Sequence, residues 1–155
     1  MAKLQPRGPL APVFVEAMTH DPEELRVIAQ DPLHNRGPLL NRTGNQIWKA
    51  GQLLLKERLP HYALPFLALH GARDTVTYPA GSQLLFDGAG AVKTKELKFY
   101  PGLYHEIFLE TAPERAAVVA DVAAFLREML RDEKKNPLLA ARGAVSGVGV
   151  MMDES

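Results

Sequence analysis

Cysteine is absent from the 155-residue sequence, which excludes disulfide bonds, thiolate metal sites and a cysteine nucleophile. Net charge is also absent, because 18 Lys and Arg balance 18 Asp and Glu, so we expect no attraction to nucleic acid. No window approaches the roughly 20 apolar residues of a membrane span, and the amino terminus has no apolar core of signal-peptide length. These absences favour a soluble, cytoplasmic protein whose length suits one domain.

Ligand clusters for a metal or a phosphate are lacking too. His20, His34 and His61 are scattered without metal-ligand spacing. Gly88 and Gly90 do not form a phosphate loop, because no strand precedes them and no Gly-Lys-Ser/Thr follows. We therefore expect neither a metal ion nor another cofactor.

Two strand-like runs are each followed by a residue that can carry chemistry. The first run, Pro65–His70, is apolar at odd and even positions alike over Phe66–Leu69, which is typical of a strand buried on both faces. Asp74 lies just beyond it, and His105 lies just beyond a second run, Glu96–Tyr100. In parallel α/β folds, functional side chains gather beyond the carboxyl ends of the strands. The pattern therefore predicts that this Asp and this His belong to one site.

Helix signals surround the two strands and define the fold class. Residues 1–20 and 34–42 read as irregular, whereas Asp21-Pro22, with Glu24 as a capping-box partner, predicts a helix start. Further helices are expected from Thr43 (with Gln46 as its capping partner), over Pro79–Phe86, and from Pro113 onward. A strand, a helix and a strand in this order favour an α/β fold with a right-handed parallel crossover.

Five short stretches occur in the order found in one enzyme family. They are Asp31–Leu33, Leu64–Gly71, Asp74–Thr77, Gly81-Ser82 and Tyr100–Glu106. In combination they resemble the carboxyl-terminal half of the monoglyceride lipase/lysophospholipase group of α/β-hydrolases, also called serine aminopeptidase S33-type hydrolases. The resemblance implies a partial α/β-hydrolase fold with a short parallel sheet and flanking helices. Residues 1–62 would be the remnant of a helical cap, residues 63–131 the carboxyl-terminal part of the hydrolase core, and residues 132–155 a flexible tail.

The resemblance also assigns two members of a catalytic triad. In that family the order is Ser, Asp, His, which puts the acid at Asp74 and the base at His105. The nucleophile elbow, Gly-x-Ser-x-Gly, does not occur around Ser82, Ser146 or Ser155, and the oxyanion-hole segment is missing as well. We therefore expect a truncated chain that begins within the cap and is inactive alone.

Neighbouring polar residues are expected to be structural. His70 reads as a strand-end residue, and Arg73 as a solvated loop charge. Lys93, Lys95 and Lys98 read as a solvated strand edge rather than a nucleic-acid patch.

Three functions are consistent with these patterns. The first, by resemblance, is a carboxylic ester hydrolase of the monoacylglycerol lipase/lysophospholipase type, whose complete form acts on a lipid ester and associates peripherally with membranes. The alternative is a non-catalytic interaction module that recruits a partner, including a second copy of itself, through an open sheet edge. A small α/β ligand-binding domain is the third, and it predicts that Asp74 and His105 lie apart.

Overall fold

A computed structural model describes residues 5–12, 14–35 and 37–131 of the chain. The predicted tail, with Ser146 and Ser155, lies outside these residues. In chain order the elements are β1 (Pro9–Ala11), the 3₁₀ helix η1 (Val15–Ala17), α1 (Pro22–Gln30), β2 (Leu39–Leu40), α2 (Asn41–Leu53), the π-helical η2 (Leu54–Arg58), the 3₁₀ helix η3 (Leu59–His61), β3 (Phe66–Gly71), α3 (Ala80–Gly88), β4 (Lys95–Tyr100) and α4 (Ala112–Arg131).

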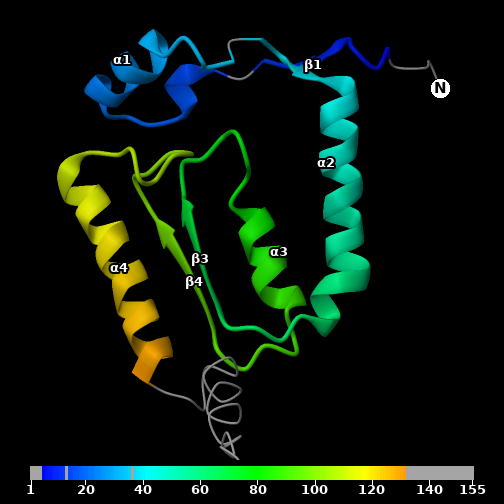
Figure 1. The fold of residues 1–155 in the computed structure, drawn as a ribbon, viewed down its shortest axis with the longest axis vertical. Helices are drawn as coiled ribbons and strands as arrows, with labels where there is room; N and C mark the ends of the chain where they lie inside the picture. The colour runs from blue at the N-terminus through cyan, green and yellow to red at the C-terminus, as the bar shows by residue number, and fades with distance from the viewer. Residues whose placement is uncertain (1–4, 13, 36, 132–155) are drawn as a thin grey trace, which may run out of the picture.

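The centre of the molecule is a parallel pair of strands between helices (Figure 1). β3 and β4 pair in register from Phe66 with Lys95 to Gly71 with Tyr100, and α3 makes the crossover between them. Side chains alternate across a strand, so Leu69 packs on the α4 side and Phe66 packs on the α3 side. The predicted α/β class and the parallel crossover are confirmed.

Two apolar clusters hold the helices to this sheet. Leu69 and the α4 residue Val118 belong to the first cluster, with Tyr100, Leu103 and Ile107. The second cluster joins η3, β3 and α3, and it contains Leu55, Leu59, Phe66, Leu85, Ala89 and Val92. The first cluster lies entirely within residues 63–131, whereas the second also includes Leu55 and Leu59.

The strand predicted to be buried on both faces is only half-buried. Phe66 to His70 are partly exposed among the described residues, and only Gly71 is buried. Two lysines of β4 that were expected to be solvated make contacts with neighbouring helices instead. Lys95 Nζ donates to the carbonyl oxygens of Phe86 and Ala89 at the end of α3, and Lys98 pairs with Asp121 of α4.

Two helix starts differ in detail from their predictions. Asp21 caps α1 as predicted, since its carboxylate accepts from the amides of Glu23 and Glu24. The predicted role of Glu24 in a capping box is wrong, because the Glu24 carboxylate pairs with Arg115 of α4 instead. α2 begins at Asn41 rather than Thr43, and no side chain caps it.

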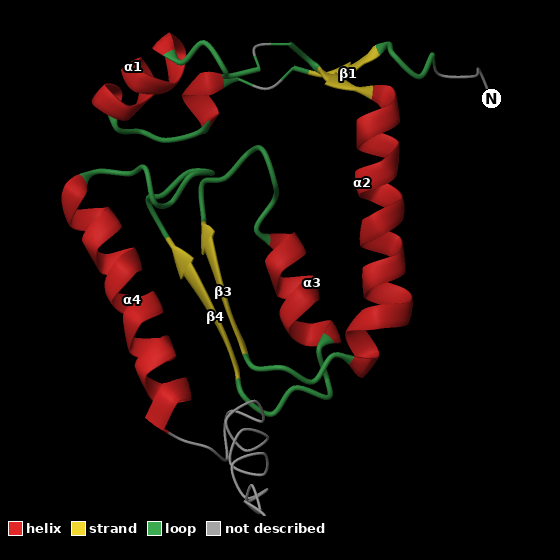
Figure 2. Ribbon diagram, in the orientation of Figure 1, coloured by secondary structure: helices red, strands yellow, loops and turns green. Residues whose placement is uncertain are grey.

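The amino-terminal region carries a small sheet that the sequence did not predict. β1 pairs antiparallel with β2 inside the stretches expected to be irregular (Figure 2). This pairing joins segments about 30 residues apart, which local patterns do not reveal. Among the described helices, none combines the length and the apolar character that crossing a bilayer requires.

Candidate active site

Gly71 sets the position of the Asp74 loop. A Cβ at Gly71 would lie 2.0 Å from the carbonyl oxygen of Tyr104 and 2.5 Å from that of Leu103. Only glycine therefore lets the end of β3 approach the loop after β4 so closely. The amide of Arg73 donates to the Leu103 carbonyl, and the amide of Asp74 donates to the Gly71 carbonyl. The two post-strand loops are thus joined through their backbones.

The Asp74 carboxylate is buried, with 4% of the residue exposed, and it is surrounded by donors. Its Oδ1 accepts from the amides of Val76 and Thr77, at 2.8 and 3.0 Å. Its Oδ2 accepts from the Thr77 hydroxyl at 2.9 Å and lies 2.9 Å from Nδ1 of His105. A third side chain, His70, places Nε2 at 3.1 Å from the same Oδ2.

These contacts decide the charge of the carboxyl group. Burial is the largest influence and raises the pKa of Asp74, because a charge is costly away from water. Hydrogen bonds from His105, Thr77 and Val76 together outweigh burial and hold the pKa below its ordinary value. Asp74 is therefore a carboxylate at neutral pH, as the acid of a triad must be.

His105 is held by the loop after β4 and by the amino-terminal segment. The amides of His105 and Glu106 donate to the carbonyls of Ala17 and Met18, at 3.4 and 2.7 Å. With Nδ1 toward Asp74, its Nε2 receives no hydrogen bond from the described residues. The predicted pair thus comes together, which counts against a ligand-binding domain in which Asp74 and His105 lie apart.

A pocket of about 290 Å³ opens at this pair. Asp74, His105, His70 and Thr77 give it a polar side, and Leu69, Ile107 and Phe108 give it an apolar side. Of these residues, Thr77 and the contact of His70 were missed by the sequence reasoning. Their only signal was their spacing around Asp74, since His70 lies four residues before it and Thr77 three after.

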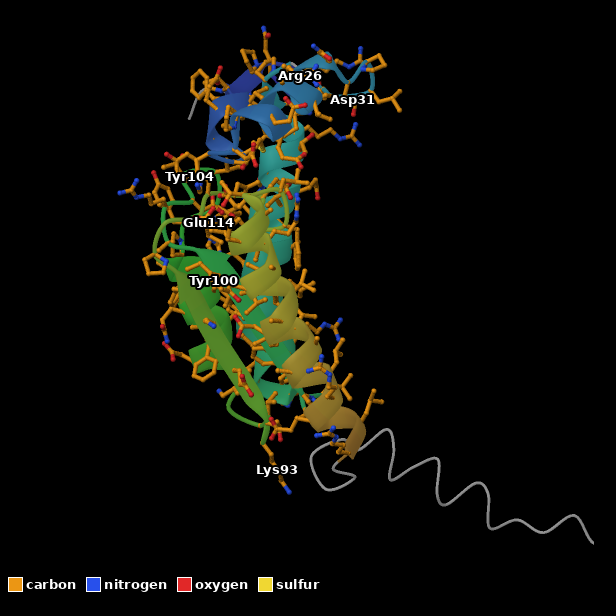
Figure 3. The ribbon with its side chains drawn as sticks, turned by 90° about the vertical axis from the view of Figure 1, so that its left-hand side faces the viewer. Arg26, Asp31, Lys93, Tyr100, Tyr104 and Glu114 are labelled. Atoms are coloured by element: carbon orange, nitrogen blue, oxygen red, sulfur yellow. The ribbon has the colours of Figure 1, made fainter. Side chains whose placement is uncertain are left out.

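Glu110 is a further residue that the sequence reasoning missed. Its fully buried carboxylate accepts from the amides of Tyr104 and His20 and from the Thr19 hydroxyl, at 2.6, 3.0 and 2.7 Å. It therefore ties the loop that carries His105 to residues 19–20. Figure 3 places Tyr104 near this end of the molecule and Lys93 at the opposite end.

Near Glu110, three side chains of types that can bind a metal ion lie close together, although the sequence showed no metal-ligand spacing there. One ligand atom each from His20, Glu110 and Glu114 lies within 4.8 Å of the others. The two imidazole nitrogens of His20 lie 2.8 Å from Glu110 and 3.1 Å from Glu114. Because both Glu110 oxygens already accept backbone amides, we interpret the group as a structural cluster of polar side chains.

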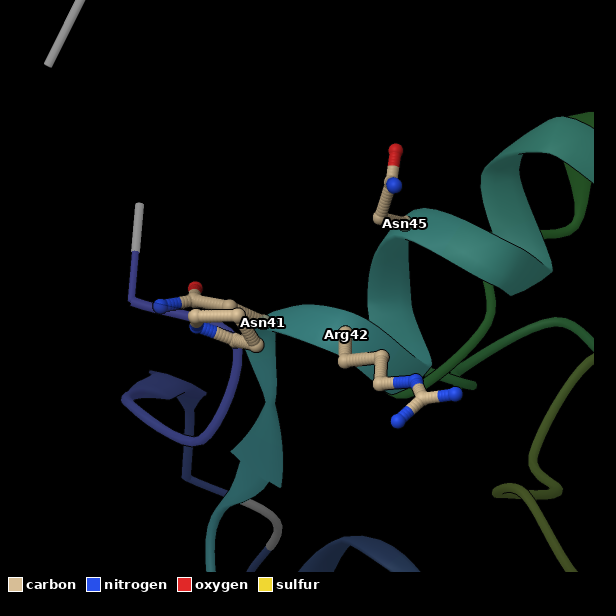
Figure 4. A pocket seen from close by; sticks show the side chains of 4 residues that line it. Asn41, Arg42 and Asn45 are labelled. Atoms are coloured by element: carbon tan, nitrogen blue, oxygen red, sulfur yellow. The ribbon is translucent and has the colours of Figure 1, made fainter. Parts of the chain in front are cut away.

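A separate hollow of about 470 Å³ lies where the amino-terminal segment meets α2. Figure 4 shows Asn41, Arg42 and Asn45 around it, and Pro6 completes its lining. Neither Asp74 nor His105 contributes to this hollow, so it is not part of the candidate site.

Comparison with known proteins agrees with this architecture. The sequence profile of the family described as serine aminopeptidase, S33 matches residues 1–112, which include both Asp74 and His105. The chain belongs to the serine aminopeptidase S33 family. The S33 match begins in the amino-terminal segment and ends at the start of α4.

The S33 relatives include enzymes named for their ester substrates. A monoacylglycerol lipase of Mycolicibacterium smegmatis is 34% identical over 126 residues, which are 81% of this chain and 44% of that protein. A caffeoylshikimate esterase of Arabidopsis thaliana is 32% identical over 99 residues, which are 64% of this chain and 29% of that protein.

A solved structure of a lipase shares the fold. A soluble variant of monoglyceride lipase from Saccharomyces cerevisiae, in complex with a substrate analog, superposes with a TM-score of 0.63 at 25% identity. The alignment covers 75% of this chain and 42% of that one. The chain thus spans less than half the length of the relatives it matches.

Proposed function

We propose that this chain carries the acid and the base of a serine ester hydrolase that acts on monoacylglycerol or lysophospholipid esters. The observation that carries the proposal is the 2.9 Å contact between His105 Nδ1 and Asp74 Oδ2, with no partner for Nε2 among the residues that the structure describes. The names of two relatives, a monoacylglycerol lipase and a caffeoylshikimate esterase, support ester hydrolysis. No Gly-x-Ser-x-Gly occurs among these 155 residues, so the proposal takes the nucleophilic serine from a part of the family fold that they do not include.

The pair performs proton transfer. Asp74 accepts a hydrogen bond from the Nδ1–H of His105, which keeps Nε2 unprotonated and directed at the serine hydroxyl, and the carboxylate stays ionised throughout. His105 Nε2 takes the hydroxyl proton while the serine oxygen bonds to the ester carbonyl carbon. The same proton then passes to the departing alcohol, and water repeats the sequence on the acyl-enzyme. The buried carboxylate stabilises the imidazolium formed in each half of the reaction.

A mostly apolar hollow beside the site suits a lipid ester. It has a volume of about 560 Å³ and lies between the amino-terminal segment and the Asp74 loop. Phe14, Ala17 and Tyr104 supply apolar surface, and Arg73 supplies a cation. In this proposal the region 1–62 acts as the cap remnant that covers the substrate, and residues 63–131 act as the core.

The test separates the isolated chain from a completed fold. The purified 155-residue chain is expected to hydrolyse no p-nitrophenyl butyrate above buffer and to take no fluorophosphonate label. A chimera that places this chain after the unmatched amino-terminal part of the M. smegmatis relative supplies the serine. We expect the chimera to hydrolyse monoacylglycerol and to become labelled.

Two variants of the chimera assign the roles. His105→Gln should lower kcat by about 10⁴-fold or more, and Asp74→Asn by roughly 10⁴-fold, because each removes a triad member. The exposed residues His61 and Asp87 give matched controls, His61→Gln and Asp87→Asn, which should keep the parent rate. Full activity in both triad variants would contradict the assignment of Asp74 as the acid and His105 as the base.

A non-catalytic role through self-association is the second candidate. The observation that favours it is a half-buried β3 that pairs on one side only within the described sheet. An inactive chimera with a well-folded, self-associating chain would favour this second role over hydrolysis.

A further inference from the structure

We propose that His70 is a positioning residue for Asp74, acting through Thr77, and that Ser82 holds the ring orientation in which His70 does so. The inference deepens the proposed function, on which its catalytic consequence rests. His70 and Ser82 come from different elements, the end of β3 and the first turn of α3. Side-chain alternation along β3 turns His70 to the α3 face, and there its Nδ1 lies 2.7 Å from Ser82 Oγ.

The second nitrogen of His70 determines where the protons are. Nε2 lies 2.8 Å from the carbonyl oxygen of Thr77. A carbonyl oxygen can only accept a hydrogen bond, so Nε2 must carry a proton. Nδ1 of the neutral ring is then the acceptor, and the Ser82 hydroxyl donates to it. The opposite tautomer would set a lone pair against the Thr77 oxygen, so Thr77 selects the tautomer. The Ser82 hydroxyl can pair with Nδ1 in either tautomer, and its contact holds the ring in the orientation that points Nε2 at Thr77.

Thr77 is in turn the residue that holds Asp74, because its amide donates to Oδ1 and its hydroxyl donates to Oδ2. The Nε2 atom of His70 itself lies 3.1 Å from the same Oδ2. Two imidazoles therefore flank one oxygen, with His105 Nδ1 on it at 2.9 Å. By donating to the Thr77 carbonyl, His70 fixes the residue whose amide and hydroxyl orient the carboxylate. The His70 side chain is 13% exposed, so it is itself largely held by its surroundings. The result is a carboxylate whose orientation toward His105 depends on the chain of contacts from Ser82 through His70 to Thr77.

Ser82, His70 and Asp74 also form a serine–histidine–aspartate chain, which raises the rival idea that Ser82 is a nucleophile. Two observations oppose it. Ser82 does not line the pocket onto which His70, Asp74 and His105 open. The amides of Gly81 and Ser82 are bonded to the carbonyls of Tyr78 and Pro79, so they cannot stabilise an oxyanion there.

The decisive experiment reads histidine tautomers in the 155-residue chain by long-range proton–nitrogen NMR, so it needs no turnover. We expect His70 to be a single Nε2–H tautomer at pH 7, with the exposed His61 as an internal control that shows both tautomers. Ser82→Ala should convert His70 to a mixture, and Ser82→Thr, which keeps the hydroxyl, should restore the single tautomer. A mixed or Nδ1–H His70 in the parent chain would overturn the proposal.

The link to His105 has its own readout. In the parent chain His105 should be an Nδ1–H tautomer, and His70→Phe, which keeps a ring against Phe99, should shift it toward a mixture. An unchanged His105 in this variant would overturn the positioning role. In the chimera, Ser82→Ala should lower kcat roughly threefold to tenfold at constant KM, and Ser82→Thr should recover it. The two proposals are tested separately. The loss of turnover upon His105→Gln tests the proposed function, and the tautomer of His70 in that variant tests the positioning role. Fluorophosphonate labelling of Ser82 would instead make it the nucleophile.

Discussion

At the scale of single residues, the acid of the candidate pair is defined more by its donors than by its burial. Two backbone amides share Oδ1 of Asp74, and the Thr77 hydroxyl and the His105 imidazole share Oδ2. Each of these donors favours the charged form and opposes the effect of the 4% exposure. Folding is therefore coupled to deprotonation of this carboxyl group.

This coupling predicts how acid affects stability. The folded-state pKa of Asp74 lies below its ordinary value of 3.8, so its contribution to stability is full above that value and is lost as pH falls through the folded-state pKa. Urea unfolding of the chain between pH 3 and pH 7 should show this loss below about pH 4.

In the Asp74→Asn variant the free energy of unfolding should fall less steeply below about pH 4, because an amide does not take up the proton. Asp87→Asn, at an exposed position on α3, is the matched control and should show the same loss of stability in acid as the parent chain. An equal loss of stability in acid for the parent and for Asp74→Asn would show that other carboxylates cause this loss.

Position along the chain was enough to predict Asp74 and His105 as partners, because each follows a strand of one parallel pair. It could not predict His70 or Glu110 as parts of the same arrangement. Their contacts cross between elements: His70 reaches Ser82 on α3, and Glu110 reaches Thr19 across 91 positions of the chain. Such contacts depend on tertiary packing, which single-sequence patterns do not encode.

At the scale of elements, the loop after β4 is fixed by a segment that lies far away in sequence. Residues 17–20 accept and donate along this loop, and Glu110 is the common acceptor. Local signals predicted α1, α3 and α4 well because caps and prolines act within one turn. They misplaced the start of α2, whose first amide, that of Asn41, donates to the distant Gly8 carbonyl.

The Glu110 anchor yields a prediction at this scale. Glu110→Gln replaces one carboxylate oxygen by an NH₂ group, which then faces donors of Tyr104, Thr19 or His20. Leaving buried groups unpaired costs about 1–3 kcal/mol, so we expect a loss of about that size in the free energy of unfolding. Hydrogen exchange at the Tyr104 and His105 amides should also become faster.

Glu114→Gln is the matched control, because the Glu114 side chain is 34% exposed and meets His20 at the surface. Exposed ion pairs contribute about 0–1 kcal/mol, so this variant should lose little stability and keep the slow exchange. Equal effects of the two substitutions would mean that Glu110 is not the anchor of the loop.

At the scale of the whole molecule, the parallel pair is the smallest sheet that can hold the site, and it leaves apolar surface uncovered. An apolar groove of about 450 Å³ runs along β3 and α4. Phe66, Leu67 and Leu69 line it from β3, and Val122, Phe125 and Leu126 line it from α4. Leu126 is 53% exposed and Phe108, beside it in the lining, is 46% exposed. Val118, Phe125 and Met129 of α4 are thus buried, whereas Leu126 on the same helix is open to solvent.

Apolar surface next to an unpaired strand edge favours association. We expect the chain to form dimers or larger species in sedimentation velocity runs as its concentration rises from micromolar to higher values. Leu126→Lys places a charge in the groove and should shift this equilibrium toward the monomer by about tenfold or more, since burying an unpaired charge is costly. Leu33→Lys is the control, because Leu33 is 91% exposed in the loop after α1 and should leave association unchanged. A chain that stays monomeric at every concentration, with both variants identical to it, would exclude self-association through this groove and leave hydrolysis in the completed fold as the better account.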